Sequence, residues 1–230
     1  SSIFFILGLI DDFKNLSPFL KLGIQIFASG IVWALGIRID FINILIFQNV
    51  EIPALLSLFL TILWIVAITN AINWIDGLDG LAAGIILILT IGILQGSIIF
   101  NQPSITLIAA SIAGCCISFL KYNFHPAKII MGDGGSYFFG FTIASLSINA
   151  FKEINQPILF NLSLLVVAIP LLDMFFVILR RISNNKSPFY PDRIHLHHRL
   201  LNAGISHRKT VYLIYIFFLI NILLMQLLFN

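Results

Sequence analysis

The 230-residue chain has few charged residues: Asp, Glu, Lys and Arg together make up 10% of it, whereas 59% is apolar. Soluble globular domains carry roughly a quarter charged residues, so this composition excludes that class and predicts a membrane protein with several spans. The net charge of +3 does not indicate nucleic acid as a partner, because the basic residues lie in polar segments between apolar runs.

Cysteine is equally scarce. Cys115 and Cys116 are adjacent inside an apolar run, and the chain has no other cysteine. This excludes a disulfide framework and fits two small side chains packed in a helix.

The chain starts with Ser1 inside an apolar run, without a basic segment or cleavage site typical of a signal peptide. We therefore expect a single integral-membrane domain, residues 1–230, truncated at its N-terminus.

Apolar runs of about 20 residues, long enough to cross a bilayer, recur along the chain. They predict an all-α polytopic membrane protein with a partial span at 3–10 and about seven full spans, at 18–37, 53–73, 81–100, 104–120, 136–151, 157–179 and 210–229. Between residues 38 and 52 polar and apolar side chains partly alternate, which indicates a short surface hairpin.

Lys and Arg are unevenly distributed between the two sets of loops that these spans create. Eleven lie in or next to 11–17, 74–80, 121–135 and 180–209, whereas Arg38 and Lys152 lie on the other side. Because basic residues favour the cytoplasmic side, we predict that the first set of loops is cytoplasmic and the hairpin is not.

Four polar motifs lie in the predicted cytoplasmic segments. The first is Asp11 and Asp12, directly after an apolar run. Adjacent carboxylates at a helix end are costly unless a cation or proton shares them, which indicates a base or a ligand for a hard cation, or else a solvated pair. Lys21, about one turn inside the next span, can hold a phosphate or reach the headgroups.

The second motif is NAINWIDGLDGL at 70–81. Asn70 and Asn73 share a helix face, and Asp76 and Asp79 follow on a glycine-containing turn. Amides and carboxylates together can recognise a nucleobase or sugar, although capping of the next helix accounts for one Asp.

The third motif is YNFHPAK followed by MGDGGS, in which Asp133 stands among glycines just before a helix. Free backbone N–H groups in such a turn can cradle a phosphate, and the Asp can bind a metal; a simple capped turn is the alternative.

The fourth motif is PDRIHLHHR at 191–199, in a polar segment of about thirty residues. Three His within four residues suggest zinc, but zinc on one helix prefers i, i+4 spacing and no Cys lies nearby. His and Arg facing phosphates fit the other motifs better, and an interfacial basic helix is the alternative.

Asp173, inside the span 157–179, is a further functional candidate, or it pairs with a loop Arg.

In this order, the four motifs resemble the signature blocks of the polyprenyl-phosphate N-acetylhexosamine-1-phosphate transferases, glycosyltransferase family 4. The resemblance runs from Asp11 to about Leu201. The block HLHHRL is more similar to the undecaprenyl-phosphate GlcNAc-1-phosphate transferase branch than to the related phospho-N-acetylmuramoyl-pentapeptide transferases, which usually have three consecutive His.

This resemblance implies transfer of an N-acetylhexosamine 1-phosphate from a UDP-sugar, with UDP-GlcNAc favoured, to undecaprenyl phosphate. UMP would be released and a cell-envelope polysaccharide, such as lipopolysaccharide, begun. It further implies Mg²⁺, with Mn²⁺ as a substitute, and a multi-pass protein of the bacterial inner membrane with a cytoplasmic active site. A homodimer is left open.

The resemblance also implies roles for individual residues. Asp133 corresponds to the metal ligand, and the catalytic set is Asp11, Asp12, His197 and His198. The substrate-binding set, with Asp79 and Asn123 nearest the uracil, is Lys21, Asn70, Asn73, Asp76, Asp79, Asn123, Lys128, Arg193 and His195. Ile130 stands where many members have an aromatic residue, which argues against stacking on the uracil here.

Two alternatives stay open: a phospho-N-acetylmuramoyl-pentapeptide transferase of peptidoglycan synthesis, and a multi-span transporter. A transporter needs ionisable groups at mid-membrane depth, whereas here, Asp173 apart, they gather at one face. The transferase assignment requires that Asp11, Asp79, Asp133 and His197 meet at one cleft around a divalent ion.

Overall fold

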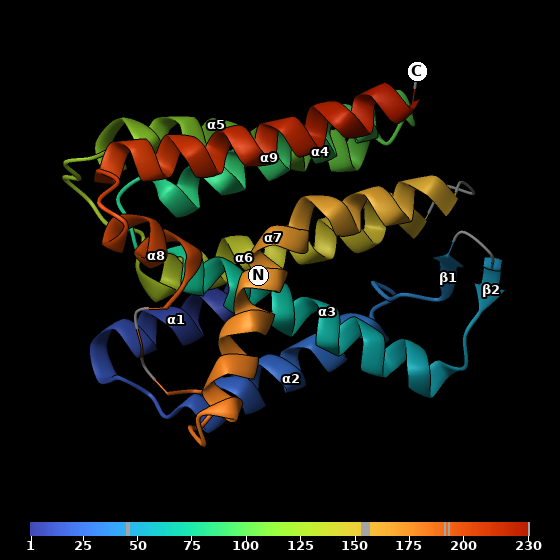
Figure 1. Ribbon diagram of the computed structural model, residues 1–230. Helices are drawn as coiled ribbons and strands as arrows, with labels where there is room; N and C mark the ends of the chain where they lie inside the picture. The colour runs from blue at the N-terminus through green and yellow to red at the C-terminus, as the bar shows by residue number, and fades with distance from the viewer. Residues whose placement is uncertain (45–46, 153–156, 191, 193, 230) are drawn as a thin grey trace.

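The computed structural model describes residues 1–44, 47–152, 157–190, 192 and 194–229. The protein is mostly helical (77%), with one small antiparallel sheet in the described part (Figure 1). The helices are α1 (Ser2–Lys14), α2 (Pro18–Ala34), α3 (Ala54–Ile75), α4 (Leu81–Ile99), α5 (Pro103–Asn123), α6 (Gly132–Lys152), α7 (Pro157–Ser183), α8 (Leu196–Asn202) and α9 (His207–Phe229).

Four helices of the described residues are long and apolar enough to cross a membrane: α3, α4, α5 and residues 207–224 of α9. The all-α membrane class is therefore confirmed, while the number of seven spans and their sidedness stay predictions. The predicted span 18–37 is the shorter apolar helix α2, which ends at Ala34. Large apolar side chains such as Phe19, Phe27 and Leu107 are exposed on the outer faces of the helices, as lipid contact requires.

The structure is helical at two places where the sequence predicted loops. The predicted partial span 3–10 continues as α1 to Lys14, so Asp11 and Asp12 lie in the last turn of a helix rather than in a loop. Asn15, in the left-handed conformation, ends α1, and Ser17 starts α2 by accepting a hydrogen bond from the Leu20 amide at 3.3 Å. The predicted loop 180–209 contains the separate short helix α8.

The helices pack in two groups. Helices α4, α5 and α9 lie side by side at the top of Figure 1, and α6 packs against both α1 and α3 below them. Phe4 of α1 stacks on Phe141 of α6, with ring centroids 4.5 Å apart. Fully buried isoleucines of α3 and α4, among them Ile72 and Ile85, fill the space between the groups.

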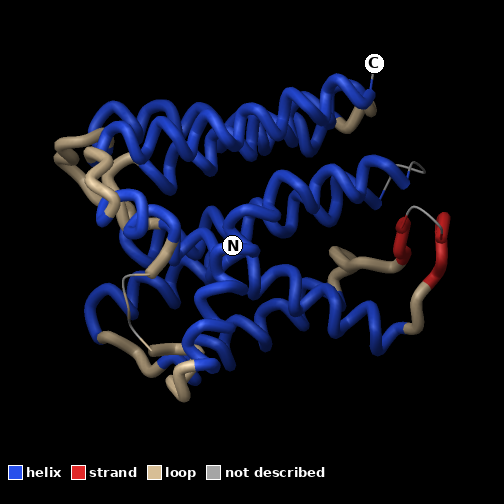
Figure 2. Tube along the Cα trace, in the orientation of Figure 1, coloured by secondary structure: helices blue, strands red, loops and turns tan. Residues whose placement is uncertain are grey.

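The predicted hairpin is confirmed. Strands β1 (Phe41–Ile44) and β2 (Phe47–Glu51) pair antiparallel, with Phe41 opposite Glu51. In Figure 2 the hairpin lies at the right, whereas the loops that follow α3, α5 and α8 gather at the left. The polar motifs therefore share one end of the molecule, opposite the hairpin.

The contact between α1 and the start of α6 depends on Gly8. A Cβ atom on Gly8 would collide with the backbone carbonyl of Asp133 and the neighbouring amide of Gly134. Only glycine allows α1 to pass this close, so this contact determines the distance between the Asp11–Asp12 pair and Asp133.

We predict that Gly8→Ala destabilises the protein by about 1–3 kcal/mol, because the backbone of α6 must move away from α1. The thermal midpoint of the detergent-solubilised protein measures this effect. Gly114→Ala, in α5, is the matched control, since a Cβ there meets no atom within 4 Å. Equal midpoints for the two variants would contradict the close contact.

Candidate active site

Asp11 is a buried carboxylate whose two oxygens both have partners. Its Oδ2 lies 2.6 Å from Nζ of Lys21, and its Oδ1 accepts a hydrogen bond from the Leu16 amide at 2.7 Å. Asp11 is 5% exposed, so the ion pair with Lys21 is partly shielded from water. The predicted Asp11 and Lys21 are therefore brought together, with the ammonium group on the carboxylate.

Asp12, by contrast, is exposed and holds the start of α6. Its Oδ1 accepts from the Asp133 amide at 2.8 Å and its Oδ2 from the Gly134 amide at 3.1 Å. A carboxylate on free amides at a helix N-terminus is stabilised by the helix dipole. Gly132, with φ +68°, brings these amides to Asp12, because a Cβ there would lie 2.8 Å from its Oδ2. Asp12 thus fills the anion cradle that the sequence suggested for a phosphate.

Asp133 lies at the centre of the acidic residues. Its Oδ1 accepts a hydrogen bond from Nδ2 of Asn73 at 2.8 Å, and its carboxyl is also hydrogen-bonded to that of Asp11. Asn73 donates to Ser136 Oγ as well, at 2.9 Å, which ties α3 to the first turn of α6. Two carboxyl groups in direct contact must share a proton or a cation.

The electrostatic effect of this crowding extends to Asp76. Burial, together with the negative charges of Asp133 and Asp12, raises the pKa of Asp76 to about 7. Excess negative charge held by oxygen donors suits a hard divalent cation such as Mg²⁺. The metal implied by the resemblance therefore fits the chemistry of these residues.

Asp79 belongs to a second group on the same turn. Its Oδ2 lies 2.8 Å from Nδ1 of His125 and accepts from the Ala127 amide at 3.1 Å, and His125 lowers the pKa of this carboxyl. Nε2 of His207 lies 3.3 Å from the Asp79 carbonyl oxygen. These contacts join loop 76–80 to the segment after α5 and to the start of α9.

The side chains of Asp79, His125 and His207 offer three ligand atoms within 4.8 Å of one another. However, the two imidazole rings are stacked, with centroids 4.1 Å apart and planes 21° from parallel. Nitrogen lone pairs lie in the ring plane, so stacked rings cannot both direct one at a common ion. In this arrangement the three residues form a hydrogen-bonded junction rather than a metal centre.

Asn123, predicted to bind the uracil, has a structural role in this arrangement. Its Oδ1 accepts from the Gly80 amide at 3.0 Å, and its Nδ2 donates to the Ile129 carbonyl at 2.8 Å. Tyr215 of α9 donates to the Gly80 carbonyl. Asn123 and Tyr215 hold the same glycine from both sides, which shapes the turn that carries Asp79.

The His block is held by α7. Asp173 accepts from the ring of His195 and from the Leu196 amide, each at 2.9 Å, and among the described residues no loop Arg pairs with it. Arg181 instead forms a two-pronged ion pair with Asp192, at 2.8 and 2.9 Å. Its guanidinium lies 4.8 Å from the ring centroid of Trp74, on α3 next to Asn73.

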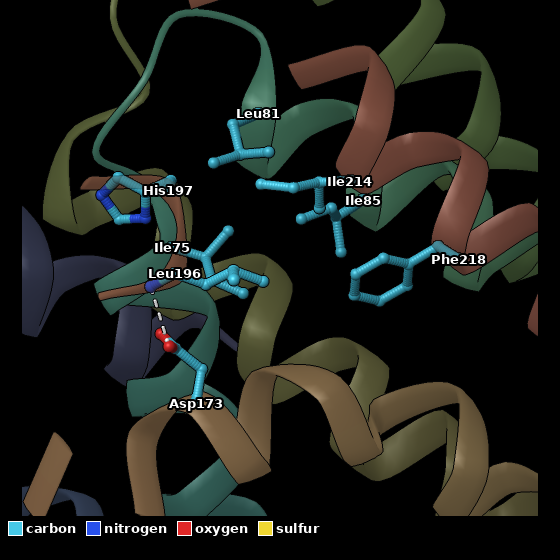
Figure 3. Close-up of a pocket in the computed structure, with 8 residues that line it drawn as sticks. All are labelled: Ile75, Leu81, Ile85, Asp173, Leu196, His197, Ile214 and Phe218. Carbon is cyan, nitrogen blue, oxygen red and sulfur yellow. Dashed lines mark hydrogen bonds between the residues drawn. The ribbon is translucent and has the colours of Figure 1, made fainter. Parts of the chain in front are cut away.

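His197 faces loop 76–80, the turn that carries Asp76 and Asp79. It is 2% exposed, and among the described residues no group hydrogen-bonds its Nε2. A Cβ on Gly77 would collide with this nitrogen, so His197 contacts loop 76–80. Figure 3 shows the ring beside an apolar pocket between α3, α4, α8 and α9, lined by Ile75, Leu81, Ile85, Asp173, Leu196, His197, Ile214 and Phe218.

The other predicted residues lie as follows. Asn70 uses its amide hydrogens within the protein, on Gln25 Oε1 at 2.6 Å and on the Val66 carbonyl at 2.8 Å. His198 is half-buried with its ring 4.2 Å from that of His197, and Lys128 is exposed. Arg193 lies outside the described residues.

Sequence reasoning missed His125, His207, Arg208 and Tyr215. Arg208 donates to the His125 carbonyl at 2.9 Å, and the other three hold Asp79 and Gly80. The signal for His125 stood inside the quoted motif YNFHPAK, and that for His207 and Arg208 was a polar pair at the start of an apolar helix.

Burial, together with the charges of His198 and His195, lowers the pKa of His197 from 6.5 to about 4, although Asp173 opposes this. As the pH falls from about 6.5 to about 4, the unfolded chain takes up a proton here and the folded protein does not, so stability is lost. Asp76, whose pKa is raised to about 7, acts in the opposite direction in both proteins. We therefore predict that the thermal midpoint of the wild type falls relative to that of His197→Gln as the pH is lowered from 7.5 to 5.0. The same pH dependence in both proteins would contradict the burial of a neutral imidazole.

The family model for glycosyl transferase family 4 matches residues 1–151. A probable undecaprenyl-phosphate N-acetylglucosaminyl 1-phosphate transferase of Bacillus subtilis is 39% identical over 219 residues, covering 93% of this chain and 60% of the relative. A decaprenyl-phosphate N-acetylglucosaminephosphotransferase of Mycobacterium leprae is 40% identical, covering 91% and 58%.

An undecaprenyl-phosphate alpha-N-acetylglucosaminyl 1-phosphate transferase of Escherichia coli K12 is 31% identical, covering 90% of this chain and 58% of the relative. The chain thus spans about 60% of the length of the curated relatives it matches. These relatives extend the similarity past residue 151, and the family model covers more than half of the chain. The protein therefore belongs to glycosyl transferase family 4.

Proposed function

We propose that this protein transfers N-acetylglucosamine 1-phosphate from UDP-GlcNAc to undecaprenyl phosphate and releases UMP, which begins a cell-envelope polysaccharide. The names of the relatives support the polyprenyl phosphate acceptor and the transferred group. The observation that carries the proposal is the convergence of Asp11, Asn73 and Asp133 at the start of α6, with His197 of α8 against the nearby loop 76–80.

The reaction joins a lipid phosphate to a nucleotide diphosphate, so the site must bring two anions together and offset their charge. We assign Asp133 to hold Mg²⁺, or Mn²⁺, whose positive charge would offset the diphosphate. Asn73 orients the Asp133 carboxylate by its 2.8 Å hydrogen bond. Few protein ligands are needed, since Mg²⁺ completes its shell with water and phosphate oxygens.

Asp11 and Lys21 contribute as a pair. A lipid phosphate is largely ionised at neutral pH, so a general base gains little, whereas a fixed cation attracts the acceptor. Asp11 holds the Lys21 ammonium at 2.6 Å, beside Asp133. We therefore assign Lys21 to the acceptor phosphate and Asp11 to its placement. Asp12 acts on the same site indirectly, through the amides of α6.

His197 contributes as a neutral group. Its low pKa keeps the ring uncharged at pH 7, and its buried Nε2 has no hydrogen-bond partner among the described residues. A donor or acceptor at this point, next to Gly77, is suited to a sugar hydroxyl or a phosphate oxygen. We assign His197 and His198 to the sugar-diphosphate side, and Asp79 to the nucleotide side.

The two alternatives are not favoured. The relatives reported above are named as GlcNAc-1-phosphate transferases, not as muramoyl-pentapeptide transferases. A transporter is disfavoured because Asp173, in the predicted span 157–179, is engaged by His195 and the α8 backbone. We further propose an inner-membrane location with the site on the cytoplasmic face; a homodimer stays a prediction.

The decisive measurement is Mg²⁺-dependent UMP release from UDP-GlcNAc in membranes that contain the protein and undecaprenyl phosphate. We predict that Asp133→Asn abolishes this release, because the amide removes the charge that would hold the metal. Asp40→Asn, near the hairpin at the opposite end, is the control and should keep wild-type turnover. Full turnover by Asp133→Asn would remove the metal role.

The orientation is tested by cysteine labelling in a Cys115→Ala/Cys116→Ala background. We predict that Asn15→Cys and Asn185→Cys react with a membrane-impermeant maleimide only from the cytoplasmic side, and Asn101→Cys only from the other, because basic residues flank the first two positions. Inside-out vesicles and intact cells provide the two exposures. A reversed pattern would put the site on the wrong face.

A further inference from the structure

The carboxylate of Asp173 is placed unusually for a charged group in the middle of an apolar helix. It lies in α7, and its side chain is 13% exposed. One oxygen contacts Nδ1 of His195 and the other accepts from the Leu196 amide, both at 2.9 Å (Figure 3 shows the second bond). A single carboxylate therefore orients both an imidazole ring and the first turn of α8.

The buried arginine of the same helix is engaged elsewhere. Arg181 is 5% exposed and is used on Asp192, on the Pro188 carbonyl and on the face of Trp74. This leaves Asp173 for the His block, and it fixes the segment before His195 against α3 independently. The two acids that flank the block along the chain, Asp173 and Asp192, thus have separate partners and separate tasks.

The hydrogen bond to Asp173 determines which ring nitrogen of His195 carries the hydrogen. An ionised carboxylate only accepts hydrogen bonds, so Nδ1 of His195 must carry the hydrogen and Nε2 is left with its lone pair. Asp173 lines one end of a pocket whose other side chains are mostly apolar, which limits the water that can compete for this bond.

The orientation of His195 is passed to its neighbours. Its ring lies parallel to that of His197, with planes 5° apart and centroids 5.9 Å apart, and meets Trp74 edge-on at 5.4 Å. His197 in turn contacts loop 76–80 at Gly77. A rotation of His195 would disturb its stacking on His197, and so would change how the His block contacts loop 76–80.

We propose that Asp173 is a positioning residue for the reaction: it holds His195 in the Nδ1–H tautomer, so that Nε2 can accept a hydrogen bond from a hydroxyl of the substrate sugar. The inference rests on the proposed function, because it assigns His195 to the sugar-diphosphate side. Asp173 itself touches no substrate. It acts as the carboxylate behind a catalytic imidazole does, by fixing the tautomer and the orientation of the ring.

The test combines kinetics with a spectroscopic reading of the tautomer. Asp173→Asn keeps the size of the side chain but lets its amide donate to Nδ1. We expect a fall in kcat for UMP release of about 100-fold, with KM for UDP-GlcNAc within about threefold. In ¹⁵N-histidine-labelled protein, the His195 signal, assigned by its loss in His195→Gln, should change to the Nε2–H pattern.

A double-mutant comparison separates positioning from a general loss of structure. If Asp173 acts through His195, then Asp173→Asn added to His195→Ala should lower turnover by less than about twofold further. Asp40→Asn added to His195→Ala is the matched control and should also have no further effect. A full 100-fold loss on top of His195→Ala, or an unchanged His195 tautomer in Asp173→Asn, would overturn the proposal.

The same samples distinguish failure of the proposed function. If the wild-type protein released no UMP from UDP-sugars, the transferase assignment would fall. The tautomer measurement needs no substrate, so it would still show whether Asp173 determines the state of His195. An Nδ1–H signal in the wild type that is lost in Asp173→Asn supports the positioning role whatever the substrate.

Discussion

The constraint on which this end of the molecule depends is the crowding of carboxylates around the start of α6. Asp11, Asp12, Asp76 and Asp133 come from three separate segments, and like charges about 4 Å apart repel by about 4 kcal/mol at an effective dielectric constant of about 20. The protein offsets this with the Lys21 ammonium group, three backbone amides and the Asn73 side-chain amide. Burial, and after it the charges of Asp133 and Asp12, raises the pKa of Asp76. A site built in this way has negative charge to spare for a cation.

The turn at 76–80 transmits this arrangement to the rest of the site. Gly77 admits the His197 ring, and Gly80, at φ +78°, lies against Phe124 and accepts from Tyr215. Because neither position has room for a side chain, segments from α5, α8 and α9 can all contact one five-residue turn. Loop 76–80 therefore connects three groups that different helices hold: the carboxylates around Asp133, the junction of Asp79 with His125 and His207, and the His block.

Much of this could be predicted from the sequence. Long apolar runs predicted the helices, the alternation at 38–52 predicted the hairpin, and the order of four polar motifs predicted the family. The convergence of Asp11, Asp133 and His197 at one end followed from assigning their segments to the same side. These features depend on chain-local composition, and local composition is visible in a sequence.

The sequence by itself determined that this is a helical membrane protein of the transferase family, because run length, charge scarcity and motif order are properties of the chain alone. Only the tertiary structure decided what each polar side chain does. It turned Asp12 to the amides of α6, Asn70 to Gln25, Asn123 to Gly80 and Asp173 to His195. Each of these partners lies far away in the chain or on another helix. A carboxylate or amide takes its role from the donor that packing places within about 3 Å, and a pattern of residues carries no such distance.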